Sequence, residues 1–137
     1  MDQIGYGLKT RTRSTMGDAE TRVRAALAAE GFGVLTEIDV AATLKTKLGI
    51  DRARYLILGA CNPQLANEAL QSEPDVGLLL PCNVIVYEDG TETVVAILDP
   101  GTMVGLTGND ELQVVASEAR ARLQRVLDAV TDRGGPQ

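Results

Sequence analysis

The sequence predicts an α+β domain in which an antiparallel sheet carries helices packed on one face. Strand-like and helix-like hydrophobic patterns alternate along the chain in the order β-α-β-(α)-β-α-β-β-α. Residues 54–61 are apolar at most positions, which is typical of a central strand covered on both faces. The dipeptide Asp89-Gly90 is a strong hairpin signal and predicts antiparallel pairing of the strands around it.

The length and composition fit a single domain. The chain has 137 residues, 45% of them hydrophobic and 23% charged, which is enough to bury a core and too apolar for a disordered chain. We expect one domain over residues 1–132 and a flexible tail over 133–137, where the sequence is polar and rich in glycine.

Charge and residue usage exclude several classes of protein. The net charge of −6 and the scattered basic residues argue against a nucleic-acid partner. No apolar stretch approaches the roughly 20 residues of a membrane span, and the N-terminus lacks a signal-peptide pattern, so we expect a cytoplasmic protein. The chain has no histidine, which excludes Cys/His zinc sites and Ser-His-Asp or Cys-His catalysis within one chain.

The first half of the chain reads as strand, helix, strand and short helix. Residues 4–13 alternate as a strand does, and Thr15 with Asp18 offers a helix start. That helix ends at Gly31, and a second strand follows over 33–40. Asp39 is placed to cap a short helix over 41–48, whose buried pair would be Leu44 and Leu48.

The second half begins with the apolar strand 54–61. Asn62 is placed to cap the next helix, and Pro63 suits its first position, where a missing N–H costs nothing. Strands over 82–88 and 91–99 form the hairpin, with Val84 opposite Val95 if Asp89-Gly90 is its two-residue loop. We expect a connection over 100–109, and then a last helix over about 110–131. The residues predicted to lie on the inner side of this helix are Leu112, Val115, Ala119, Leu123, Val126 and Val130.

One group of residues stands out as a candidate site. Cys61-Asn62-Pro63 ends the apolar strand and opens a helix, and Pro81-Cys82 opens the next strand. Strand ends often line a crevice, and a helix start there would favour an anionic group. The alternative is that both cysteines are ordinary core residues, because free cysteine behaves as a small hydrophobe.

A soft-metal site is a second interpretation of the same residues. Two thiolates from Cys61 and Cys82 with a thioether from Met103 would suit Cu(I). No CxxC motif supports it, and a disulfide is not expected in a reducing cytosol. Asp39 is a further candidate, either as a helix cap or as a pocket carboxylate at the same edge of the sheet.

Three stretches form a recognisable set: residues 30–40 (EGFGVLTEIDV), 58–63 (LGACNP) and 79–88 (LLPCNVIVYE). In this order they resemble the DUF302 family of small bacterial and archaeal proteins without assigned activity. The resemblance extends from Tyr6 to about Val130. It implies a TBP-like β-α-β(4)-α arrangement, here with short inserted helices, and a homodimer. Asp39, Cys61, Asn62, Pro63, Pro81 and Cys82 match its motifs.

Three functional hypotheses follow. The first is a dimeric binding module for a small ligand, anionic ligands included, held near the Cys61/Asn62 helix start and Cys82. The second is a thiol-redox or copper-type protein that uses Cys61 and Cys82. The third is a non-catalytic regulatory or interaction protein. Binding is favoured over catalysis, no residue is assigned a catalytic role, and no cofactor is identified.

Overall fold

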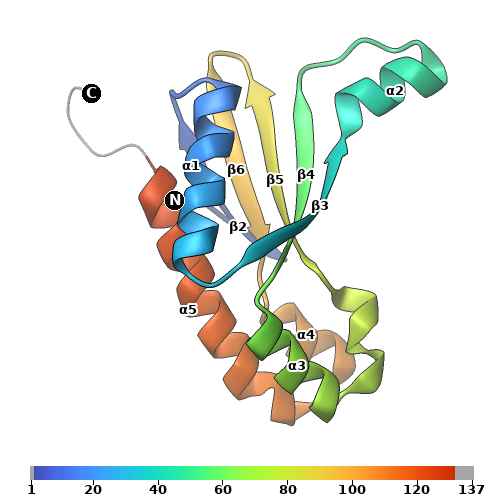
Figure 1. The fold of residues 1–137 in the computed structure, drawn as a ribbon, viewed down its shortest axis with the longest axis vertical. Helices are drawn as coiled ribbons and strands as arrows, with labels where there is room; N and C mark the ends of the chain where they lie inside the picture. Colours follow the sequence, from blue (N-terminus) through green and yellow to red (C-terminus); the bar gives the residue numbers. More distant parts are fainter. Residues whose placement is uncertain (1, 132–137) are drawn as a thin grey trace.

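The computed structural model of the chain describes residues 2–131 and contains one antiparallel sheet of six strands (Figure 1). The strand order is β1-β2-β6-β5-β4-β3. The elements are β1 (Asp2–Ile4), β2 (Gly7–Thr12), α1 (Met16–Ala29), β3 (Gly33–Asp39), α2 (Val40–Leu48), β4 (Tyr55–Cys61), α3 (Pro63–Ser72), the 3-10 helix η1 (Pro74–Leu79), β5 (Cys82–Asp89), β6 (Glu92–Leu98), α4 (Thr102–Thr107), the 3-10 helix η2 (Asp110–Leu112) and α5 (Gln113–Val130). The α+β prediction and the β-α-β(4)-α core, from β2 to α5, are confirmed.

Helices α1 and α5 lie side by side on one face of the sheet (Figure 1). Their apolar stripes meet the inward residues of the central strands in one buried cluster. Leu27 of α1 and Leu123 of α5 are fully buried there, against Leu58 of β4 and Val84 of β5. The inner side predicted for the last helix is buried throughout, as its helical spacing indicates.

An ion pair fastens the end of α1 to α5. The guanidinium of Arg125 donates to both carboxylate oxygens of Glu30, over distances of 2.9 to 3.1 Å. These hydrogen bonds lower the pKa of Glu30 and raise that of Arg125. The guanidinium of Arg122 also donates to the Glu30 carbonyl, so the C-cap of α1 is held from two turns of α5.

Within residues 2–131, no helix packs on the other face of the sheet (Figure 1). In β4, Leu56, Leu58 and Ala60 point into the buried cluster, while Tyr55 and Ile57 point to the opposite face and are half-buried. The prediction that strand 54–61 is covered on both faces is therefore wrong. The remaining helices α3, η1, α4 and η2 do not cover this face, because they gather in a second apolar cluster at one end of the sheet (Figure 1).

Three local predictions also need correction. Residues 4–13 form a hairpin, because Gly5-Tyr6 turns the chain between β1 and β2. The second hairpin has the loop Gly90-Thr91, with Gly90 at a φ of 63° as a type II′ turn requires, so Val84 faces Ile97. The connection over 100–109 contains the short helix α4.

Helix α2 has no core of its own. It projects from the end of β3 and lies near β4, and none of its residues is buried (Figure 1). Leu48, predicted to be buried, is 65% exposed, and Leu44 is half-buried.

None of the helices within residues 2–131 is both long and apolar enough to cross a membrane. The predicted tail over 133–137 lies outside the described residues.

Replacing Leu27 with alanine should lower the free energy of unfolding by about 2–5 kcal/mol, because it leaves a cavity between α1, α5 and the sheet. Urea unfolding followed by circular dichroism measures the change. The matched control is Leu78→Ala in η1, where the side chain is 89% exposed and the expected change is below about 0.5 kcal/mol. Equal effects of the two substitutions would show that Leu27 is not part of the core.

Candidate functional sites

The first candidate site is a small cavity at the end of the sheet where β4 finishes and β5 begins. Cys61 is the last residue of β4, and Cys82, the first of β5, pairs with Ala60. Residues of helices α3, α4 and α5 also line this cavity. Its volume is about 30 Å³, and it is lined by Phe32, Ala60, Cys61, Asn62, Leu65, Ala66, Ala69, Leu80, Cys82, Met103, Val115 and Ala119.

Asn62 caps α3 as predicted. Its side-chain oxygen accepts a hydrogen bond of 3.1 Å from the Leu65 amide, and Pro63 opens the helix. Asn62 is buried, and it lies against Gly31 at the end of α1. A Cβ atom at Gly31 would lie 2.9 Å from the Asn62 Nδ2 atom, and Gly31 has a φ of 82°, so glycine is needed there on both counts.

The structure brings together some of the predicted site residues and separates others. Cys61, Asn62, Cys82 and Met103 line the cavity, but Pro63 and Pro81 are not among its lining residues. Pro81 instead lies against Gly59 of β4, where a Cβ atom would be 2.8 Å from the proline ring.

Asp39 lies at the opposite end of the sheet from the cavity. In the pairing of β3 with β4, Gly33 is opposite Cys61, whereas Asp39 is opposite Leu56. Its carboxylate accepts a 2.9 Å hydrogen bond from the Ala42 amide and so caps α2. The expectation that Asp39 shares one edge with Cys61 and Cys82 is wrong, because β3 runs antiparallel to β4 and carries Asp39 away from that edge.

The two cysteines differ in their surroundings. Both are free thiols; Cys61 is partly exposed, whereas Cys82 is 8% exposed. Burial, together with the charge that Cys61 would carry, raises the pKa of Cys82 to about 11. Cys82 therefore remains a neutral thiol in the folded protein near neutral pH.

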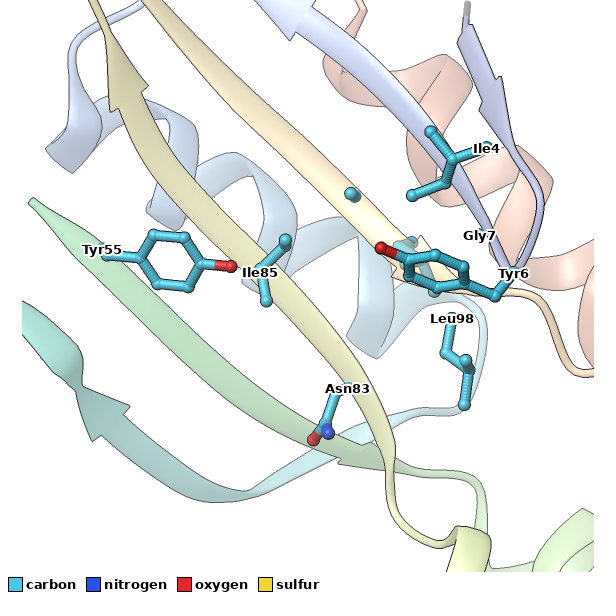
Figure 2. Close-up of a pocket in the computed structure, with 9 residues that line it drawn as sticks. Ile4, Tyr6, Gly7, Tyr55, Asn83, Ile85 and Leu98 are labelled. Atoms are coloured by element: carbon cyan, nitrogen blue, oxygen red, sulfur yellow. The ribbon is translucent and has the colours of Figure 1, made fainter.

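The second candidate site is a groove of about 290 Å³ on the helix-free face of the sheet, which the sequence analysis did not identify. Figure 2 shows Tyr55 of β4 and Tyr6 of the β1–β2 turn on opposite sides, with their hydroxyl groups pointing toward each other over Ile85. Asn83 lies along one side. The lining residues are Ile4, Tyr6, Gly7, Tyr55, Asn83, Ile85, Ala96, Ile97 and Leu98.

One wall of the groove is held by ring contacts. The ring of Tyr55 stacks on that of Tyr87, with centroids 5.1 Å apart and planes within 9°. The Arg52 guanidinium lies 5.0 Å from the Tyr55 ring centre, at cation–π distance. Partial burial raises the pKa of Tyr55, so its hydroxyl keeps its proton and can donate a hydrogen bond.

The sequence does contain a signal for this groove. Tyr55 and Ile57 alternate with buried residues in β4, and Ile85 and Tyr87 do the same in β5. The two main helices that cover the sheet pack on the same face, so one apolar face stays open.

Comparison with known proteins places this geometry in a family. Residues 8–130 match the family model described as "Domain of unknown function DUF302". The chain belongs to the DUF302 family. A similar solved structure is the crystal structure of an uncharacterized conserved DUF302 protein from Bacillus stearothermophilus, with a TM-score of 0.86 and 30% sequence identity. The similarity covers 93% of this chain and 99% of that one. No curated protein matches the chain.

Thiol labelling should distinguish the two cysteines. At about pH 8, a pKa of about 11 leaves about one Cys82 side chain in a thousand as thiolate, and burial shields it further. Iodoacetamide should therefore modify Cys61 alone in the native protein and both thiols in urea, as read by mass spectrometry.

The serine variants provide the controls for this labelling. Cys82→Ser should leave native labelling unchanged, and Cys61→Ser should abolish it. Because the unfolded chain loses the Cys82 proton first, this thiol's contribution to stability should fall as pH rises from about 9 through about 11. Rapid native labelling of Cys82 would contradict both expectations.

Proposed function

We propose that this DUF302 protein is a binding module whose small-molecule ligand occupies the groove on the open sheet face. The groove carries the proposal by its apolar lining together with its volume of about 290 Å³, which is near the lower end of the range for small-ligand pockets. A hollow of about 370 Å³ beside Asp39 is more open, and its lining includes the charged residues Glu37 and Lys47. The cavity beside Cys61 and Asn62, at about 30 Å³, has room for about one water molecule. A molecular ligand, anionic or neutral, therefore fits the groove and not the helix start.

The lining of the groove favours a flat and mainly apolar ligand. Ile4, Ile85, Ala96 and Leu98 offer aliphatic surface, and none of the nine lining residues is charged. Polar groups are few: the hydroxyls of two tyrosines and the exposed amide of Asn83. A neutral ring compound with one or two hydrogen-bonding groups matches this surface better than an anion does.

The two sides of the groove differ in rigidity. The Tyr55 ring contacts both the Tyr87 ring and the Arg52 guanidinium, and these contacts restrict the position of its hydroxyl. Tyr6 belongs to a two-residue turn and is largely exposed, while its backbone carbonyl is held by the Asp99 amide. We infer that the Tyr6 side chain closes over a ligand that has first settled against Tyr55.

Indole is a suitable probe of this proposal, because the chain contains no tryptophan and indole emission can be read directly. Saturable binding is expected for the wild type. Tyr55→Phe should weaken it by up to about tenfold, the worth of one hydrogen bond. Ala96→Leu should abolish it, since a larger side chain would fill the floor of the groove.

The matched control for Ala96→Leu is Ala129→Leu, on the exposed side of α5 and away from the open face of the sheet. It should bind indole as the wild type does. Benzoate, an anion of similar size, should bind more weakly than indole. The proposal of a neutral ring ligand would be contradicted if Ala96→Leu and Ala129→Leu lost indole binding equally. It would also be contradicted if benzoate bound more tightly than indole.

A homodimer is the second part of the proposed function, and helix α2 is the observation that favours it. A nine-residue helix with no buried residue is shorter than the roughly 12–15 residues that an isolated helix needs in water. Large apolar side chains are exposed on this projecting arm (residues 38–50), at Ile38, Leu48 and Ile50. We infer that a second copy of the chain covers this arm.

Charge supports a second copy as the partner. The last turn of α2 carries Lys45, which pairs with Asp51 over 2.9 Å, and Lys47, whereas the whole chain has a net charge of −6. The basic tip of the arm therefore complements the average surface of another copy. Edge-to-edge pairing of β3 is less favourable, because Glu37, Asp39 and the bulge between Val34 and Thr36 all disfavour addition of a strand.

Sedimentation velocity tests the dimer. The wild type should sediment as two copies of the 14.5 kDa chain, and the double variant Leu48→Lys, Ile50→Lys as one. Leu78→Lys, at an exposed leucine of η1 away from the arm, should remain dimeric. A monomeric wild type at tens of micromolar, or a dimeric double variant, would remove the arm as the interface.

A further inference from the structure

Three sulfur-bearing residues from three separate elements line the small cavity. Cys61 ends β4, Cys82 begins β5 and Met103 belongs to α4, so they are far apart in the chain. All three line the same space of about 30 Å³. Cys82 and Met103 are 8% and 5% exposed, and Cys61 provides the partly exposed side.

The cavity is poorly suited to water. A buried water needs two to four polar partners, and most of the lining side chains are aliphatic or aromatic. The one amide in the wall belongs to Asn62, whose oxygen already accepts the Leu65 amide. The three sulfur-bearing residues and Asn62 are therefore the lining residues whose side chains can act as metal ligands.

The donor set selects a class of metal ion. Among the described residues no three His, Cys, Asp or Glu side chains are grouped so that they could hold a metal, so a tetrahedral zinc site lacks ligands. Oxygen donors, which Mg²⁺ and Ca²⁺ require, are also missing from the cavity wall apart from the Asn62 amide. Two thiols and one thioether form a soft set of low coordination number, which suits Cu(I).

We propose that the cavity is a binding site for a single Cu(I) ion, held by Cys61, Cys82 and Met103. Binding involves no change of oxidation state. Cu(I) arrives bound to a carrier or chelator, the two thiols release their protons to solvent, and two copper–thiolate bonds form with the Met103 thioether as third ligand. The loaded site carries a net charge of −1.

The fold provides partial compensation for that charge. Helix α3 starts at Asn62–Pro63, directly after Cys61, and its ten residues direct a positive dipole end toward this edge of the sheet. Pro63 has no N–H and the Leu65 amide is capped by Asn62, so the Gln64 amide is the first-turn donor that adds to the positive potential. This site is separate from the ring-binding groove, so either proposal can fail without the other.

Competition with the chromophoric Cu(I) chelator bathocuproine disulfonate, under anaerobic conditions, tests the site on the reduced full-length protein. The wild type should take one Cu(I) per chain. Cys82→Ala should weaken binding by at least about 100-fold and Met103→Leu by about tenfold, since losing a ligand costs no less than losing an outer-shell partner. Met16→Leu, at a buried methionine in the other core cluster, is the matched control and should bind as the wild type does.

A second measurement is independent of variant stability. One equivalent of Cu(I) should protect Cys61 of the wild type from iodoacetamide, and copper X-ray absorption should show sulfur as the only ligand type. Wild-type protein that leaves all copper with the chelator would overturn the proposal. So would undiminished labelling of Cys61 in the loaded protein, or nitrogen and oxygen ligands at the copper.

Discussion

The packing of α1 and α5 against a single face of the antiparallel sheet is the constraint on which the rest of the structure depends. Leu27 and Leu123 bring the apolar stripes of the two helices onto the strands, and the ion pair of Glu30 with Arg125 fixes the helices relative to each other. Because the sheet's core is complete on that side, nothing in the described chain is left to cover the other side. The open apolar face follows directly from this arrangement.

The second apolar cluster extends the sheet at one end. Helix α3 begins where β4 stops, and η1 returns the chain to β5, so α3, η1 and α4 build a layer that continues the core beyond the last strand residues. The cysteines lie at the seam between the two clusters. That location explains why Cys82 is buried among apolar groups, while Cys61, one residue beyond the strand partner of Cys82, keeps access to solvent.

Features encoded by neighbouring residues could be predicted from the sequence. Thr15, Asp39 and Asn62 cap helices because each needs only the amide three positions along the chain. The inner side of α5 follows from its spacing alone. Features that depend on tertiary placement could not be predicted: an apolar strand such as β4 gives no indication of whether its second face is covered by a helix or left open.

The errors in register have a similar origin. A shift of the hairpin loop from Asp89-Gly90 to Gly90-Thr91 preserves the inward and outward alternation of β5 and β6, so the hydrophobic pattern fits both. The position of Asp39 depends on the direction of β3 relative to β4, which the hydrophobic pattern does not encode. The groove depends on tertiary placement in the same way, since Tyr6 and Tyr55 are brought together only by the strand order β1-β2-β6-β5-β4.

The contact of Gly59 with Pro81 has an implication for how sequences of this fold can diverge. Gly59 lies between Thr36 and Pro81, pairs with Asn83, and has no room for a side chain. Cys82 and Asn83 are joined by one peptide bond and project to opposite faces of β5, toward the cavity and the groove. A shift of the backbone at Gly59 would move both the cavity and the groove. Substitutions at Gly59 therefore require compensating substitutions at its neighbours Thr36 and Pro81.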